Sequence, residues 1–109
     1  MNYGNLLNLR EDYICIWLGV QDKFSDHVSN PRLRCELCRL VNKIGDCLHD
    51  DRIYSKSTLF DIVSYYERLE AIAGSKTFKK EISLIRKYLD WYIEKVRKIV
   101  QEFYYVHSI

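Results

Sequence analysis

The feature that most constrains this sequence is a stripe of apolar side chains that recurs at helical spacing near the N-terminus. When successive residues are placed about 100° apart, the stripe keeps to one arc for about six turns. A β-strand would instead alternate between two faces. The sequence therefore predicts an amphipathic helix over residues 6–29. The stripe consists of Leu6, Leu9, Tyr13, Ile16, Trp17, Val20, Phe24 and Val28.

Three further segments show the same periodicity. The apolar residues expected to be buried at 31–49 are Leu33, Leu37, Leu40, Val41, Ile44 and Leu48, and those at 58–73 are Leu59, Ile62, Val63, Tyr66, Leu69 and Ala73. The helix expected at 31–49 has Asn30 as its N-cap and Pro31 at its first position. Proline is tolerated there because the backbone N–H that it lacks would have no partner within the helix. The helix expected at 77–106 carries apolar residues along its whole length. At about 1.5 Å per residue it would be roughly 45 Å long.

The remaining segment is a helix expected at 58–73. Thr58 with Asp61 three residues later has the pattern of a capping box, and Gly74 is placed to end the helix in the C′ role. Four amphipathic helices with short connections predict one all-α domain over residues 1–109. We expect a mostly antiparallel four-helix bundle with a long C-terminal helix.

The composition agrees with a helical domain and excludes several other classes. Hydrophobic residues make up 48% and charged residues 29%, while four Gly and one Pro are too few for a turn-rich β-sandwich or barrel. No apolar run approaches the ~18–20 residues of a membrane span, and no basic-then-apolar leader begins the chain. Four cysteines are too few for a disulfide scaffold, so we expect a reduced, cytoplasmic protein without membrane attachment.

A cluster of thiols and one imidazole raises the question of a metal site. Cys35, Cys38, Cys47 and His49 form the spacing C-x2-C-x8-C-x-H, which offers four zinc ligands. On a continuous helix, however, His49 lies about 16–21 Å along the axis from the first two cysteines. Only a break near Gly45 would bring the ligands together, so we expect no metal and no other cofactor, and a metal or redox sensor ranks last among the functions considered.

The histidines do not form a catalytic pattern. His27, His49 and His107 each lie near a helix end, and none belongs to a nucleophile elbow. Small helical ribonucleases of the HEPN type carry Arg, four to six residues, then His, whereas nine residues separate Arg39 from His49 and Arg97 from His107. We therefore expect no enzyme activity, and we interpret His27 as a core-edge histidine hydrogen-bonded to the backbone.

Charge is unevenly distributed along the chain. Residues 1–75 hold nine Lys or Arg and eleven Asp or Glu, while residues 76–109 hold eight and four, a balance of +4. Acidic Asp90 and Glu94 interrupt the basic side of the last helix, as is typical of a solvated face. The positive balance makes nucleic-acid binding by this helix the alternative function, and the interrupting acids rank it second. The bases are Lys79, Lys80, Arg86, Lys87, Arg97 and Lys98.

The last helix is also more apolar than a peripheral bundle helix needs to be. A second stripe widens its apolar arc to more than half the circumference, whereas about 100–140° is sufficient. The helix is therefore either central to the bundle or faces a partner through Tyr88 and Trp91, residue types favoured as interface anchors. The second stripe consists of Leu84, Tyr88, Trp91, Ile99 and Val106.

The link between the second and third expected helices is acidic and aromatic. Its candidate binding residues are Asp46, Asp50, Asp51 and Tyr54. Carboxylates near a helix C-terminus are unfavourable, and a basic partner would relieve that cost. The stretch Asp51–Tyr54 is similar to the Asp-x-Ile-Tyr stretch with which colicin DNase immunity proteins bind their toxins. The likeness covers four residues, Ser55-Lys56 replaces the Tyr-Pro that follows in that family, and we assign no family from it.

Together these patterns favour a non-catalytic protein-binding bundle. We expect an immunity protein, antitoxin or small inhibitor that neutralises a toxin or effector by direct binding. The binding surface would combine the acidic link with the stripe around Tyr88 and Trp91. If these two elements lie on different sides of the bundle, only one of them can serve.

Overall fold

The computed structural model describes residues 11, 13, 19–49 and 55–107, with side chains described up to residue 105. In this part of the chain there are four helices and no strand, as the periodicity predicted. The N-terminal helix is described over residues 19–27, and residues 11 and 13 are also helical. The other three helices are α2 (Pro31–His49), α3 (Lys56–Ala73) and α4 (Lys79–His107).

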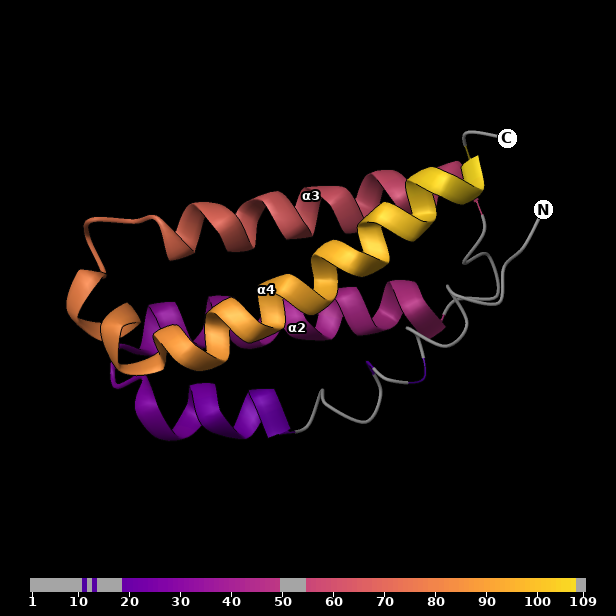
Figure 1. Ribbon diagram of the computed structural model, residues 1–109. Coiled ribbons are helices and arrows are strands. Elements are labelled where there is room, and N and C mark those ends of the chain that lie inside the picture. Colours follow the sequence, from indigo (N-terminus) through magenta and orange to yellow (C-terminus); the bar gives the residue numbers. More distant parts are fainter. Residues whose placement is uncertain (1–10, 12, 14–18, 50–54, 108–109) are drawn as a thin grey trace.

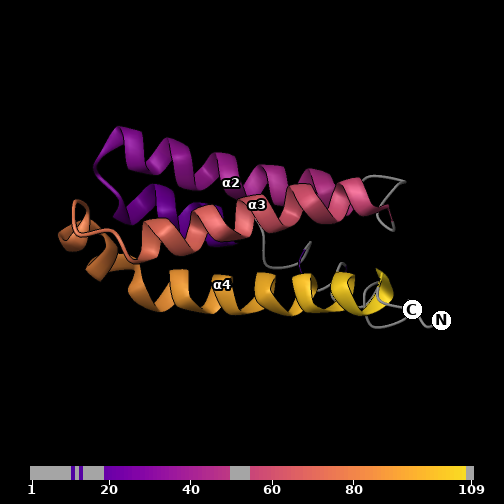
Figure 2. The ribbon, with the colours of Figure 1, turned by 90° about the horizontal axis from the view of Figure 1, so that it is seen from above.

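The helices form an elongated bundle with Cα extents of 44 × 24 × 19 Å. In Figure 1 the chain runs along α2, returns along α3 and runs forward again along α4, so that successive helices point in opposite directions. Figure 2 shows that α2 and α4 lie on opposite sides of α3 when the bundle is seen from above. The N-terminal helix lies below, on the side away from α3. In Figure 1, α4 crosses obliquely in front of α2.

The start of α2 is held by the expected cap. The side-chain oxygen of Asn30 accepts hydrogen bonds from the backbone N–H groups of Arg32 and Leu33, at 3.0 and 3.2 Å. Two of the donors that a helix start leaves unpaired are thereby satisfied. Pro31 occupies the first helical position.

The start of α3 differs from the sequence prediction, whereas its last residue agrees with it. The N-cap is Ser55, whose hydroxyl accepts the N–H of Thr58 at 3.2 Å, so the predicted cap at Thr58 is wrong. Thr58 lies inside the helix and is buried. It does not act as the cap, because the hydroxyl of Ser55, three residues earlier, already takes that role. Gly74 ends the helix as expected, but its φ of −91° shows that it does not use the left-handed conformation typical of the C′ position.

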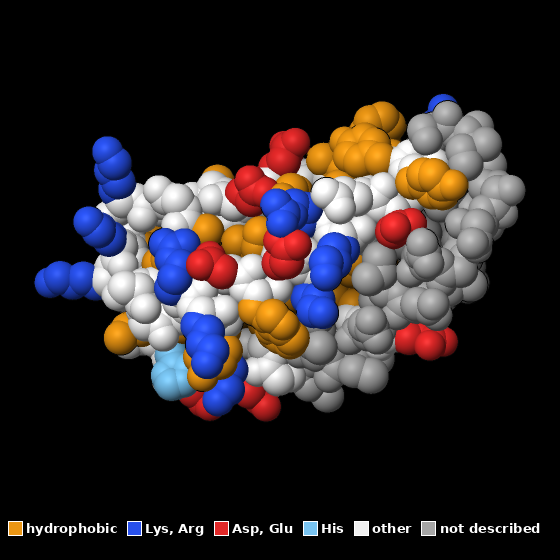
Figure 3. Space-filling model, viewed as in Figure 1, with side chains coloured by type: hydrophobic (Ala, Val, Ile, Leu, Met, Phe, Trp, Pro, Cys, Tyr) orange, Lys and Arg blue, Asp and Glu red, His pale blue; other side chains and the backbone are white. Residues whose placement is uncertain are grey.

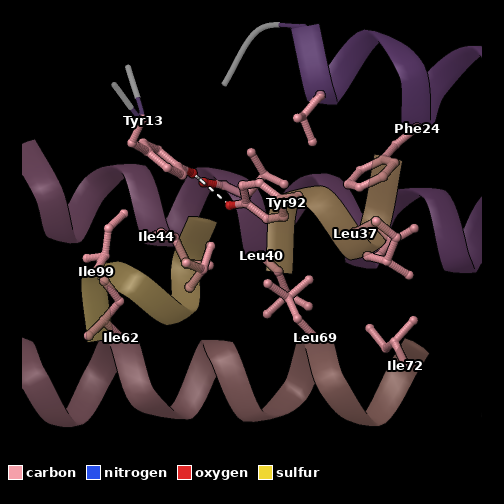
Figure 4. Close-up of a cluster of buried hydrophobic side chains, with 14 of the residues drawn as sticks. Tyr13, Phe24, Leu37, Leu40, Ile44, Ile62, Leu69, Ile72, Tyr92 and Ile99 are labelled. Carbon is pink, nitrogen blue, oxygen red and sulfur yellow. Dashed lines mark hydrogen bonds between the residues drawn. The ribbon is translucent and has the colours of Figure 1, made fainter. Parts of the chain in front are cut away.

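The core receives apolar side chains from all four helices. The predicted stripes supply most of it, including every apolar residue expected to be buried on α2. Figure 4 shows side chains of α2, α3 and α4 converging with Phe24 of the N-terminal helix. Ile72 is an addition that the expected α3 stripe did not contain.

A buried pair of tyrosines links three of the helices. The hydroxyl of Tyr13 donates to the carbonyl oxygen of Val41 on α2 at 2.6 Å, and the hydroxyls of Tyr13 and Tyr92 lie 2.9 Å apart (Figure 4). Because Tyr13 has a single hydroxyl hydrogen, Tyr92 donates to Tyr13. Burial raises the pKa of both phenols above the ordinary value, so they remain neutral.

Candidate functional site

The cysteines of α2 are spread along one continuous helix. Helix α2 passes through Gly45 without a break, and Cys35 is exposed while Cys38 and Cys47 are half-buried. Among the described residues, no group of three or more His, Cys, Asp or Glu side chains is arranged to hold a metal ion. The exposure of Cys35 also means that no helix of the bundle covers the polar face of α2 at this position.

The most distinctive surface lies where α4 meets the N-terminal helix. The ring of Tyr88 is stacked on the ring of His27, with a centroid distance of 6.0 Å and an interplanar angle of 9°. The ammonium group of Lys23 lies 5.2 Å from the centroid of the same ring. Lys23 and His27 are one helical turn apart and therefore reach Tyr88 together. Tyr88 is half-buried and also packs against the core.

Trp91 continues this surface one turn further along α4. It is 44% exposed, and the ammonium group of Lys95 lies 6.0 Å from its ring centroid. Lys87, Tyr88 and Trp91 line an open apolar hollow of about 370 Å³. Leu84, one turn before Tyr88, is 68% exposed. These seven residues form what we call the α4 patch, namely Lys23, His27, Leu84, Lys87, Tyr88, Trp91 and Lys95.

The part of the α4 patch that lies on α4 carries unpaired positive charge. Within the described part of the chain, neither Lys87 nor Lys95 forms an ion pair. The acidic residues that flank Trp91 on α4 are already engaged, Asp90 by Arg86 and Glu94 by Arg97. Figure 3 views this side of the molecule and shows basic and apolar side chains adjoining along α4.

The second apolar stripe of α4 divides into two parts with different roles. Tyr88 and Trp91 reach the surface, whereas Ile99, on the same line of the helix, is buried in the core. The side chain of Val106 lies outside the described residues.

A second, polar hollow of about 170 Å³ lies between the end of α2 and the start of α3. Asp46 lines it together with Asp61 of α3 and is itself exposed. The pKa of Tyr65 in this hollow is raised, first by burial and then by the neighbouring Cys47 and Asp61. The other predicted members of the acidic surface, Asp50, Asp51 and Tyr54, lie outside the described residues.

The predicted binding residues that are described therefore fall on two separate surfaces. Asp46 belongs to the hollow between α2 and α3, whereas Tyr88 and Trp91 lie on α4 beside the N-terminal helix. Among the residues that the structure describes, the two hollows share no lining residue.

Sequence reasoning missed the contribution of the N-terminal helix to the α4 patch. His27 was expected at the edge of the core, but it is exposed and its ring stacks on Tyr88. Its place at the rim of the apolar stripe was the available signal, since side chains there border the adjacent helix. Nothing in the sequence around Lys23 indicated that it would join this patch.

Comparison with known proteins adds no relative to this description. No family model, curated protein or solved structure matches the chain. Of the helices that the structure describes, none combines the length and the apolar character needed to cross a membrane.

Proposed function

We propose that this chain is a non-catalytic helical bundle that acts by binding another protein, as an immunity protein, an antitoxin or a small inhibitor does. The observation that supports this proposal most is the exposure of Trp91 beside an apolar hollow. Tryptophan and tyrosine are enriched among the few residues that dominate binding energy at protein interfaces. A contiguous exposed apolar surface commonly marks such an interface.

The α4 patch is also held in place before any partner arrives. Tyr88 packs against the core on one side and against His27 and Lys23 on another. A ring fixed in this way loses little side-chain entropy on binding, which leaves more of the contact energy for affinity. In contrast, the polar hollow around Asp46 offers no exposed large apolar anchor among its described lining residues.

Nucleic-acid binding is the second candidate, and one observation favours it. Unpaired lysines next to stackable rings are a combination that single-stranded nucleic acids use. Two of the six bases on this side of α4 are nevertheless engaged within the chain. Arg86 donates to the carbonyl of Ala73 at the end of α3 and pairs with Asp90, and Arg97 pairs with Glu94. Helix α4 is therefore not a continuous basic track, and protein binding is the better explanation.

The test is an affinity capture from the cells that naturally produce this protein. Wild-type bait should retain one protein in near-stoichiometric amount, and Trp91→Ala bait should lose most of it. Phe60→Ala is the matched control, because Phe60 is a large apolar side chain that is 72% exposed on α3, away from the patch. Asp46→Ala tests the polar hollow.

The outcomes of this capture test the proposed function and the proposed binding surface separately. If wild-type bait retains no protein, or only nucleic acid, the proposed function is wrong. If Asp46→Ala loses the partner and Trp91→Ala keeps it, the chain still binds a protein, but through the hollow between α2 and α3.

A further inference from the structure

The chemistry of the α4 patch indicates what kind of protein segment it accepts. We infer that its partner presents a large apolar side chain flanked by Asp or Glu, so that the apolar group enters the hollow and the carboxylates meet the surrounding lysines. This inference rests on the proposed function. It also reverses the charge that the sequence suggested for the partner, since the acidic link predicted a basic one.

The floor of the hollow calls for an apolar group. Tyr88 and Trp91 present ring surface, and Lys87 contributes the aliphatic part of its side chain. The volume of about 370 Å³ lies near the lower end of the ~300–1,000 Å³ range of ligand pockets, enough for one or two large apolar side chains. A partner that placed a charged group on this floor would desolvate it without an opposite charge.

The rim of the hollow favours negatively charged groups of the partner. Lys23 and Lys95 lie over the two aromatic rings, and Lys87 lines the hollow itself. Together they place three ammonium groups around a surface only two helical turns long on α4. Carboxylates of a partner would meet them at a partly desolvated interface, where opposite charges set orientation and speed association.

The acidic residues that the structure describes near this rim do not neutralise it. Asp90 and Glu94 are held by Arg86 and Arg97. Asp22 and Asp26 of the N-terminal helix are exposed, but each lies about 60–100° of helix rotation from Lys23. They limit the patch on one flank and leave the side facing α4 positive.

The inference is tested by selecting random twelve-residue peptides displayed on phage against immobilised protein. Binders to the Tyr88→Ala, Trp91→Ala double variant are removed first, so that the remaining peptides depend on the patch. We expect the enriched peptides to combine Phe, Leu, Ile or Trp with two or more nearby Asp or Glu. In fluorescence anisotropy, such a peptide should bind Trp91→Ala about tenfold or more weakly than wild type.

Reversing the charges of the patch and of the peptide provides a more specific test. The Lys87→Glu, Lys95→Glu variant should lose the acidic peptide and gain affinity for the same peptide with its Asp and Glu replaced by Lys. The matched control is Lys76→Glu, Lys79→Glu, which makes the same change in net charge at residues outside the α4 patch, with Lys79 about 18 Å from Trp91 along the axis of α4. This control should bind the acidic peptide within about twofold of wild type, and circular dichroism should show each variant folded.

These experiments test the inferred chemistry of the partner separately from the proposed function. Enrichment of basic or uncharged peptides, no patch-dependent enrichment, or equal loss in the control variant would overturn it. Preferential binding of a fifteen-residue oligodeoxythymidine to the patch would also overturn it. If the capture experiment still yields a partner in any of these cases, the proposed function stands and only the partner chemistry is wrong.

Discussion

Single buried hydroxyl groups determine how tightly three helices of this bundle are joined. Tyr13 both donates to the carbonyl of Val41 and accepts from Tyr92. Its loss would leave the hydroxyl of Tyr92 buried without an acceptor, whereas the loss of the Tyr92 hydroxyl would leave the bond to Val41 intact. Since an unsatisfied buried donor costs more than one lost hydrogen bond, the two tyrosines are not equivalent.

We expect Tyr13→Phe to lower the free energy of unfolding by about 1–3 kcal/mol and Tyr92→Phe by about 0.5–1.5 kcal/mol. The double variant should cost less than the sum of the two, because it removes both partners of one bond. Urea unfolding followed by circular dichroism measures all three. Equal costs for the single variants, or strictly additive effects, would contradict the donor assignment.

Alkaline pH provides a second test at this scale. Burial raises the pKa of Tyr13 and Tyr92 above 10.0, and it raises that of Tyr66 to about 12, with a further contribution from the hydrogen bond to Glu70. Tyrosines of the unfolded chain titrate near pH 10, so above it the unfolded state releases protons that the folded state retains. The free energy of unfolding should therefore fall as the pH rises from about 10 to about 12. Urea midpoints at several pH values measure this, and Tyr13→Phe should reduce the dependence.

At the level of the elements, helix ends are where local sequence and structure agree least. Asn30 caps α2 as predicted, but α3 begins two residues before its expected start because Ser55 acts as the cap. Both Ser55 and Thr58 are residue types that cap helices, and the sequence pattern alone does not rank them. The choice depends on burial, since Thr58 lies against the core.

We expect Ser55→Ala to destabilise the protein by about 1 kcal/mol, through loss of the bond to the N–H of Thr58. Asp61→Ala should change the free energy of unfolding by less than about 0.5 kcal/mol, because Asp61 is exposed and does not close a capping box. Urea unfolding of the two variants compares them directly. A larger cost for Asp61→Ala would restore the cap predicted at Thr58.

At the level of the whole molecule, α4 contributes to both the core and the surface. Ile99 in its C-terminal half is buried, while Leu84 and Trp91 in its N-terminal half are exposed. The excess apolar arc of this helix therefore has two different environments. Part of it serves a central helix, and part is left at the surface.

This division predicts opposite outcomes for the same substitution on one helix. Leu89→Asp places an unpaired charge in the core, where Leu89 is 0% exposed, and should unfold the protein. Leu84→Asp, at a position 68% exposed, should leave the helical circular dichroism spectrum and the melting temperature nearly unchanged. A folded Leu89→Asp variant would contradict the placement of this stripe in the core.

The periodicity of apolar residues determined the helices and most of the core, because a side chain's position around its own helix follows from local geometry alone. It could not determine which helix lies beside each stripe. That Lys23 and His27 join Tyr88, that Ile99 is buried while Trp91 is exposed, and that Asp46 lies apart from both rings were decided only by tertiary packing. The reason is physical, since helix crossing angles arise from ridges and grooves that two helices form together.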